Sequence, residues 1–272
     1  MRMKIQFLAV LAALFLGVAL GPTAASAGEA PPAELKPLFD KIDAKAGAGK
    51  KTEADFADEL KALDALIAKH KGEKTEEAAM IVYAKAAFYN DVVDDDRKRD
   101  ALTAQIIRDF PDTKISRRLK LRAEGKKLAA TLVAGARFPE LAGQDLSGKP
   151  LALSTYKGKV LLIDFWDTDC PPCVFEMPSL LKAYARYHTN GFEIIGVSLD
   201  TDKAKLERFL ADQKMAWPQL FDGQEFDGQL PIKFGVDAIP TTYLLDGAGN
   251  VIARDLRGDD LEKAVAQAMT KP

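Results

Sequence analysis

The sequence contains very little cysteine: its 272 residues include only two, Cys170 and Cys173. Small secreted domains that depend on disulfides for stability contain several cysteines, so a scaffold of that class is excluded. A bond between residues three apart closes a very short loop, and the stabilisation that a disulfide gives grows with loop length. The pair is therefore explained better by chemistry than by structural stabilisation.

The sequence also has no excess of positive charge and only two histidines. Lys and Arg number 38 against 40 Asp and Glu, a formal net charge of -2, so the chain has no overall positive field to attract nucleic acid. A structural zinc site takes four ligands, and the soft ligands besides the cysteines are His70 and His188, which lack zinc-finger spacing. Metal binding is thus a disfavoured explanation of the Cys-x-x-Cys motif, and no metal or organic cofactor is expected.

Outside its N-terminus the sequence lacks any apolar run of the roughly 20 residues that a membrane-spanning helix needs. At the N-terminus, Arg2 and Lys4 precede an apolar run at 7–20, and small residues follow at 25–27. This order is typical of a secretory signal peptide, which we predict over residues 1–27. We expect the mature protein to be periplasmic or secreted, with no stable membrane insertion. An uncleaved signal that anchors the chain in the membrane is the alternative.

Residues 28–134 are predicted to form an all-α domain, because they are rich in Ala, Lys, Glu and Leu at helical spacing and offer few strand signals. One helix is predicted from Thr52, a second from Thr75, and Pro111 ends a third. Residues 106–113 resemble the helix-ending phrase of some tetratricopeptide-type hairpins. A plain helical bundle without repeats is the alternative.

At Gly135 the pattern changes to short apolar runs separated by Gly, Pro and Asp, which places a domain boundary there. Residues 135–272 are predicted to form an α/β fold with a mixed sheet flanked by helices. The run 160–166 is typical of a buried central strand, and a helix is predicted at 171–187. Further strands are predicted at 141–146, 151–153, 192–199, 242–245 and 251–256, and further helices at 203–214 and 259–269.

The Cys-Pro-Pro-Cys motif follows a predicted buried strand and opens a predicted helix. A cysteine at a helix N-terminus meets unpaired backbone N–H groups and the positive end of the helix dipole, which stabilise the thiolate. Cys170 is therefore the predicted attacking thiol. Pro171 and Pro172 stiffen the entry to the helix without costing a backbone hydrogen bond. Cys173, one turn inward, is the predicted resolving thiol, which attacks Cys170 and releases the partner from the mixed disulfide.

Cys173 can break the mixed disulfide only after a base has removed the proton of its thiol. Asp164 lies six residues before Cys170, inside an otherwise apolar strand, and Glu176 lies three residues after Cys173 on the helix. An unpaired carboxylate in an apolar strand is costly, and burial raises its pKa toward the range that suits proton transfer, so a functional role is favoured for Asp164. For Glu176 an ordinary exposed helix residue is the alternative.

From about residue 136 to the end, the chain resembles the TlpA-like (ResA-like) branch of the thioredoxin superfamily, here with an N-terminal helical extension. The resemblance implies a thioredoxin fold and a thiol-disulfide oxidoreductase activity on a disulfide-bearing protein. It rests on these phrases: Gly-Lys-Val-Leu-Leu-Ile-Asp-Phe-Trp at 158–166, Cys-Pro-Pro-Cys, Glu-Met-Pro at 176–178, Gly-Val-Ser at 196–198, and residues 235–246 around Ile-Pro-Thr-Thr.

The resemblance also assigns a substrate-binding surface. It implies that Ile239–Pro240 is a cis peptide facing the cysteine pair and that the Ile239 backbone pairs with the substrate chain. We also predict that Trp166, Asp169, Pro171 and Pro172 contribute to substrate binding. The resemblance further implies a membrane electron donor of the DsbD or CcdA kind. The substrate is left open between an apocytochrome c haem-binding pair, as in cytochrome c maturation, a misfolded exported protein, and a dedicated partner.

The sequence departs from this family at Asp169, where a Trp usually precedes the first cysteine. A carboxylate beside Cys170 raises the pKa of its thiol and opposes the helix dipole. A higher thiol pKa favours the disulfide and lowers the reduction potential, so we predict a reductant of protein disulfides.

Two other functions fit parts of the sequence. A peroxidase of the peroxiredoxin type shares the fold but needs a particular Thr and Arg around a single peroxidatic cysteine, and that arrangement is absent. A protein-binding adaptor is the second alternative, in which the helical domain contacts a partner.

Overall fold

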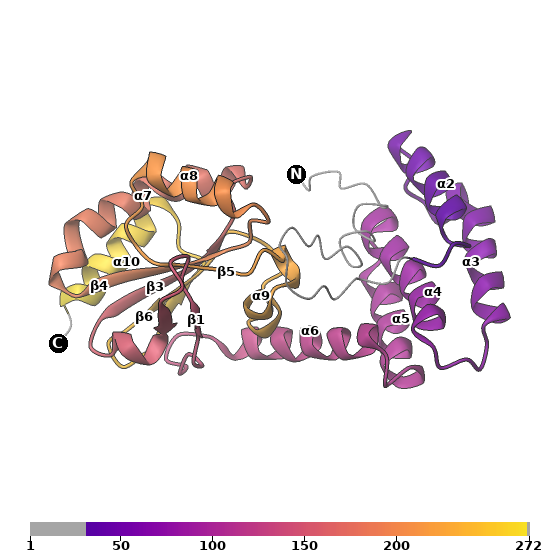
Figure 1. Cartoon of the computed structure of the whole chain (residues 1–272), viewed down its shortest axis with the longest axis horizontal. Helices are drawn as coiled ribbons and strands as arrows, with labels where there is room; N and C mark the ends of the chain where they lie inside the picture. The colour runs from indigo at the N-terminus through magenta and orange to yellow at the C-terminus, as the bar shows by residue number, and fades with distance from the viewer. Residues whose placement is uncertain (1–30, 271–272) are drawn as a thin grey trace. The chain divides into compact units, whose positions relative to one another are not determined.

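The structure, a computed structural model, describes residues 31–270 (Figure 1). The predicted signal peptide lies outside the described residues. The described residues divide into two compact units, with the division between Leu121 and Arg122. Within residues 31–270, no helix combines the length and the apolar character needed to cross a membrane.

The first unit is helical in its described part, as predicted. Thr52 accepts a hydrogen bond from the backbone N–H of Asp55, and the Asp55 carboxylate accepts one from the N–H of Thr52 at 3.1 Å, which makes a capping box. Thr75 caps the next long helix, because its side chain accepts a hydrogen bond from the backbone N–H of Ala78. The elements are α2 (Lys36–Gly47), η1 (Glu53–Phe56), α3 (Ala57–Lys69), α4 (Glu76–Phe88), the π-helical turn η2 (Tyr89–Val93), α5 (Asp96–Asp109) and α6 (Lys114–Thr131).

The core of the first unit is centred on α4, the helix with the most buried side chains. Phe56 and Phe88 pack edge to face with ring centroids 5.2 Å apart, and α3 and α5 both pack against α4. Phe39 and Ile42 of α2 close the same core. The helical unit is thus held together by one continuous apolar cluster.

The second unit is built on a five-stranded mixed sheet in the order β5-β4-β3-β6-β7. Strands β3, β4 and β5 are parallel, whereas β6 runs antiparallel to β3 and β7 antiparallel to β6. This confirms the predicted thioredoxin-type fold. The strands are β1 (Ala142–Gln144), β2 (Pro150–Ala152), β3 (Val160–Trp166), β4 (Phe192–Ser198), β5 (Gln219–Phe221), β6 (Thr241–Leu245) and β7 (Val251–Arg254). The helices are η3 (Leu153–Tyr156), α7 (Pro171–Tyr187), η4 (His188–Asn190), α8 (Lys203–Gln213), η5 (Glu225–Asp227), α9 (Gln229–Lys233) and α10 (Gly258–Thr270).

Strand β3 lies at the centre of this sheet and has a core on each face. Successive side chains of a strand point to opposite faces. Leu161, Ile163 and Phe165 therefore join one apolar cluster, while Leu162 and Trp166 join the other, together with residues of α7 and α10. Figure 1 shows α7 and α10 side by side over this sheet. By the same alternation, the residue between Leu162 and Trp166, which is Asp164, faces the layer that contains α7.

The division between the two units lies inside α6, before the boundary predicted at Gly135. The cause is packing in the second half of the helix. Leu128 contacts the apolar cluster of the second unit, and a Cβ atom added at Gly125 would lie 1.9 Å from the carbonyl oxygen of Ile232. Only glycine permits that approach of α6 to α9. Helical periodicity predicted the helix but not which unit its end packs in.

Candidate active site

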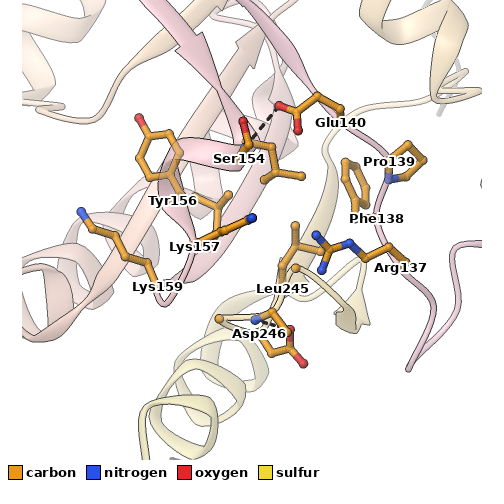
Figure 2. Close-up of a pocket in the computed structure, with 15 residues that line it drawn as sticks. Arg137, Phe138, Pro139, Glu140, Ser154, Tyr156, Lys157, Lys159, Leu245 and Asp246 are labelled. Atoms are coloured by element: carbon orange, nitrogen blue, oxygen red, sulfur yellow. Dashed lines mark hydrogen bonds between the residues drawn. The ribbon is translucent and has the colours of Figure 1, made fainter.

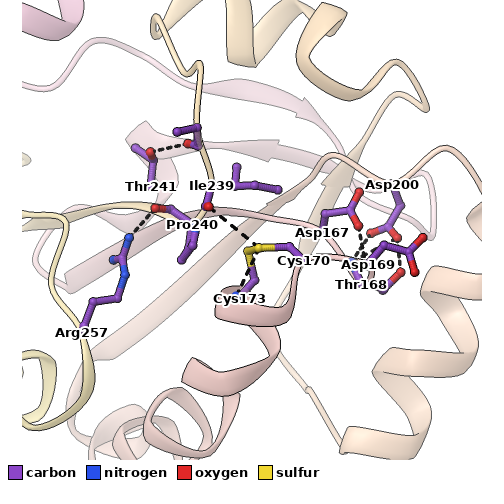
Figure 3. Close-up of a disulfide and its surroundings, with 11 residues drawn as sticks. Asp167, Thr168, Asp169, Cys170, Cys173, Asp200, Ile239, Pro240, Thr241 and Arg257 are labelled. Atoms are coloured by element: carbon purple, nitrogen blue, oxygen red, sulfur yellow. Dashed lines mark hydrogen bonds between the residues drawn. A yellow bond between two sulfur atoms is a disulfide. The ribbon is translucent and has the colours of Figure 1, made fainter. Parts of the chain in front are cut away.

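Cys170 and Cys173 form a disulfide at the N-terminus of α7, with their Cα atoms 5.2 Å apart (Figure 3). Cys170 is the N-cap residue, and the backbone N–H of Cys173 points at its Sγ atom at 3.2 Å. Cys170 is half-buried, whereas Cys173 is only 1% exposed. A sulfur on an incoming polypeptide can therefore reach Cys170 but not Cys173. Cys170 and Cys173 therefore remain the predicted attacking and resolving thiols.

The loop before β6 faces this disulfide. The Ile239–Pro240 peptide bond is cis, as the resemblance implied. The Sγ atom of Cys170 lies 3.9 Å from the carbonyl oxygen of Ile239, and both residues of the loop are half-buried. Figure 3 shows the disulfide between this loop and the first turn of α7. The backbone of Ile239 is thus within reach of a chain bonded to Cys170.

Asp164 lies beneath the site in the layer between β3 and α7. It is 2% exposed, and its Oδ1 atom has no hydrogen-bond partner among residues 31–270. Burial raises the pKa of Asp164 to about 7; the Arg257 guanidinium opposes this shift, and the Glu176 carboxylate adds to it. A carboxyl group with this pKa can accept and return a proton near neutral pH, as the predicted base must.

Glu176 is half-buried and makes a specific contact that an ordinary exposed helix residue would lack. Its Oε2 atom accepts a hydrogen bond of 2.6 Å from the backbone N–H of Gly258, the first residue of α10. The carboxylate thereby satisfies one of the unpaired N–H groups at the start of that helix. Glu176 therefore has a structural role in addition to its electrostatic effect on Asp164.

Arg257 is a component of the site that the sequence analysis did not identify. Its guanidinium donates hydrogen bonds to the carbonyl oxygens of Pro240 and Leu256 and to the hydroxyl of Thr242. Thr242 pairs with Asp164 across β3 and β6. One cation therefore holds the cis-proline loop and acts electrostatically on the buried carboxyl group. An arginine in a turn before a helix gives no sequence signal of this role, because its partners come from distant segments.

A second polar cluster surrounds the chain just before Cys170. The buried Thr168 donates its hydroxyl to Asp200, which also accepts a hydrogen bond of 2.7 Å from Ser198. These bonds anchor the loop to the end of β4; Figure 3 shows the one between Thr168 and Asp200. Asp169 is exposed and forms an ion pair with Lys205 of α8. Lys205 was not anticipated from sequence, and its cation opposes the effect of the Asp169 carboxylate on Cys170.

Three of the predicted substrate contacts, Pro171, Pro172 and Trp166, differ in burial. Pro171 and Pro172 are exposed at the tip of α7, as a contact surface requires. Trp166, in contrast, is 0% exposed, and its indole N–H donates to Gln219 at 3.0 Å. A fully buried side chain cannot touch a docking chain, so the prediction that Trp166 contacts substrate is wrong. Instead, its ring packs against Phe209 of α8 in the core beneath the site.

Figure 2 shows a separate pocket at the opposite end of the sheet, where β3 begins and β6 ends. Its lining includes Arg137, Lys157 and Asp246, and across it the Glu140 carboxylate accepts a hydrogen bond from the N–H of Ser154. No cysteine lines this pocket. Among the described residues, no group of three or more His, Cys, Asp or Glu side chains is arranged to hold a metal ion.

Comparisons with known proteins found several similarities. The Redoxin family matches residues 133–270. Thiol-disulfide oxidoreductase ResA of Bacillus thuringiensis is 30% identical over 137 residues, which are 50% of this chain and 77% of the relative. ResA of Geobacillus thermodenitrificans is 34% identical over 117 residues, 43% of this chain and 66% of the relative. Among solved structures, the thioredoxin domain of a thiol-disulfide oxidoreductase from Bacteroides vulgatus is 32% identical, with a TM-score of 0.48 over 51% of this chain and 99% of that one.

Proposed function

The chain belongs to the Redoxin family and is a thiol-disulfide oxidoreductase, and from that premise we propose that it reduces protein disulfides outside the cytoplasm. The single observation that carries the proposal is the unequal burial of the two cysteines at the start of α7. Cys170 is half-buried, and Cys173 is enclosed and already bonded to it. This arrangement favours attack by one thiol and resolution by the other.

The proposed reaction starts from the dithiol form. The Cys170 thiolate attacks one sulfur of the substrate disulfide, a mixed disulfide forms, and the substrate's other sulfur leaves as a thiolate that takes up a proton. Cys173 then loses its proton and attacks the Sγ atom of Cys170. The mixed disulfide breaks, the second substrate thiolate leaves, and the Cys170–Cys173 bond closes. Two electrons pass from this chain to the substrate.

Asp164 is the proposed base of the second step. It lies on the same face of β3 as Leu162 and Trp166, which pack in one cluster with Cys173, and its pKa of about 7 lets it take the thiol proton near neutral pH. Glu176 and Arg257 adjust this pKa in opposite directions. In this proposal Arg257 is a positioning residue: it orients the cis-proline loop and sets the ionisation of Asp164.

The extracytoplasmic location is supported by the N-terminal sequence pattern, which lies outside the described residues. A reductant in an oxidising compartment needs electrons from another protein, and a membrane donor of the DsbD or CcdA kind would supply them. The proposed substrate is an exported protein with a disulfide, among which an apocytochrome c haem-binding pair is one candidate.

The direction of the reaction is tested by the reduction potential of the Cys170–Cys173 couple, measured in a series of redox buffers. A reductant requires a potential near that of thioredoxin, about -270 mV, whereas an oxidant lies near about -120 mV. We expect a value in the lower part of this range, together with reduction of insulin disulfides. A potential above about -180 mV would contradict the proposed direction.

Two further readouts address the other functions considered for the sequence. A peroxidase would consume hydrogen peroxide at a rate comparable with its reduction of insulin, and we expect no such consumption. An adaptor would keep its biological role after replacement of both cysteines by serine. We expect that double variant to lose the role.

A further inference from the structure

Helix α7 has an exposed apolar face in addition to its buried one. Its buried residues include Cys173, Met177 and Leu180, spaced as one face of a helix. A second set of apolar residues occurs at the spacing i, i+3, i+4 and i+7, and none of them is buried: Pro171, Val174, Phe175 and Pro178. We call these four residues the α7 stripe. An amphipathic helix normally places polar residues on its solvent side, so this one departs from the usual pattern.

Phe175 is the most exposed member of the α7 stripe. At 81% exposed, it leaves more of its surface in water than Leu121 and Val133, the two other large apolar side chains that are exposed in the described residues. Burying a side chain of this size on a partner is strongly favourable. Thr168, Asp169, Pro171, Val174 and Phe175 line a shallow depression beside it. The surface is therefore hollowed as well as apolar.

The α7 stripe begins at the residue that follows Cys170. A chain joined to Cys170 by a disulfide places its own cysteine Cα about 5.5–6 Å from that of Cys170. In an extended segment, the second residue from this cysteine lies about 7 Å further on and points to the same side. Phe175 is five residues along the helix from Cys170, a rise of about 7.5 Å. A side chain two positions from the partner cysteine can thus reach Phe175.

We propose that the α7 stripe is a docking site for an apolar side chain two residues from the cysteine of the substrate disulfide. This inference rests on the proposed function and adds the class of substrate: an extended polypeptide with an apolar residue at that position. The site is continuous with the reacting sulfur, and the polar pair Asp169 and Lys205 lies at its rim. An apolar centre with a polar rim is the usual anatomy of a protein interface.

The test compares a peptide disulfide with a small one. The peptide carries Leu two positions from its cysteine on both sides, a matched peptide carries Ser there, and bis(2-hydroxyethyl) disulfide has no side chains. The wild-type protein should prefer the Leu peptide over the Ser peptide about tenfold in kcat/KM, which corresponds to about 1.4 kcal/mol. Phe175→Ser should abolish this preference, and Phe175→Leu should largely restore it. Val133→Ser, which changes another exposed apolar residue, should leave the preference unchanged.

The outcomes separate this inference from the proposed function. If the wild-type protein reduces all three disulfides but Phe175→Ser retains the Leu preference, the docking site is contradicted and the oxidoreductase function stands. If the wild-type protein reduces none of them, the proposed reducing function fails. The α7 stripe could instead bind a second copy of this chain. A wild-type protein that sediments as a dimer, with a monomeric Phe175→Ser variant, would overturn the assignment to substrate.

Discussion

The carboxylate of Glu176 on α7 accepts the backbone N–H of Gly258 at the start of α10, across a distance of 2.6 Å. The same residue raises the pKa of the buried Asp164 by its charge. Glu176 therefore combines a hydrogen bond between two helices with an electrostatic effect on the active site. The two roles depend on different properties of the side chain, so substitutions can separate them.

Glu176→Gln keeps an oxygen acceptor for Gly258 but removes the negative charge. We expect its free energy of unfolding to stay within about 0.5 kcal/mol of wild type at pH 5, because the hydrogen bond is retained. Glu176→Ala should lose about 1 kcal/mol, the usual cost of removing a helix cap. Urea unfolding of the oxidised proteins measures both values. Equal losses in the two variants would show that the hydrogen bond to Gly258 does not stabilise α10.

The buried carboxyl group of Asp164 should make stability depend on pH. Its pKa is about 7 in the folded chain against an ordinary value of 3.8, so its stabilising contribution is complete below about pH 4 and declines as the pH rises to 7. Each pKa unit corresponds to about 1.4 kcal/mol, so wild type should lose about 3 kcal/mol relative to Asp164→Asn between pH 5 and pH 8. Urea unfolding at the two pH values measures this. Parallel pH dependences in the two proteins would contradict the raised pKa.

Asp164→Asn should also slow the second step of the reaction. Without the base, the Cys173 thiol ionises less readily, and the mixed disulfide should resolve about 100-fold more slowly near neutral pH, since general base catalysis typically contributes at least that factor. Rapid acid quench followed by mass spectrometry measures the decay of the mixed disulfide. Formation of the mixed disulfide, which Cys170 performs, should change much less. An equal slowing of both steps would indicate a general disturbance of the site.

Arg257 and Glu176 should move the pH profile of resolution in opposite directions. Removing the guanidinium in Arg257→Ala should raise the pKa of Asp164 above 7, whereas Glu176→Gln should lower it. Arg257→Lys keeps the charge and should restore much of the profile, although it loses the fork of hydrogen bonds to Pro240 and Thr242. The midpoint of the rate against pH is the readout. If the midpoint does not move in Arg257→Ala, then Arg257 holds the cis-proline loop but does not affect the pKa of Asp164.

Much of the second unit could be predicted from sequence because its elements are long or strongly patterned. The run 160–166 and the helix 171–187 have the predicted bounds, since a continuous apolar run and a proline-initiated helix are clear local signals. β5 (Gln219–Phe221) and α9 (Gln229–Lys233) were missed. They have only three and five residues, too few to express a periodicity.

The site shows the same division between local and distant contributions. Cys170, Asp164 and the cis-proline lie in motifs that are contiguous in sequence. Arg257 and Lys205 act through contacts with residues far away in the chain, so no local pattern marked them. The burial of Trp166 likewise depends on α8 and β5, which pack over it. Sequence identified the proposed reacting groups, and only the tertiary structure identified the residues that contact or act electrostatically on them.

The ion pair between Asp169 and Lys205 predicts opposite shifts in the pKa of the Cys170 thiol when either partner is replaced. Asp169→Asn removes a negative charge beside Cys170 and should lower the pKa of its thiol, whereas Lys205→Gln leaves Asp169 uncompensated and should raise it. Both shifts should be small, because the Asp169 carboxylate is 77% exposed and solvent screens it. Alkylation rates of the reduced protein measured against pH give the values. A pKa that is unchanged or raised in Asp169→Asn would refute the effect of charge.

The central claim is that Cys170 attacks the substrate and Cys173 completes the exchange. It is tested most directly by trapping the mixed disulfide with single-cysteine variants and a peptide disulfide, detected by intact-protein mass spectrometry. Cys173→Ser should accumulate a stable adduct bonded through Cys170, and Cys170→Ser should form an adduct at least about 100-fold more slowly, because Cys173 is buried. Adduct formation at similar rates in both variants, or faster formation in Cys170→Ser, would contradict the account.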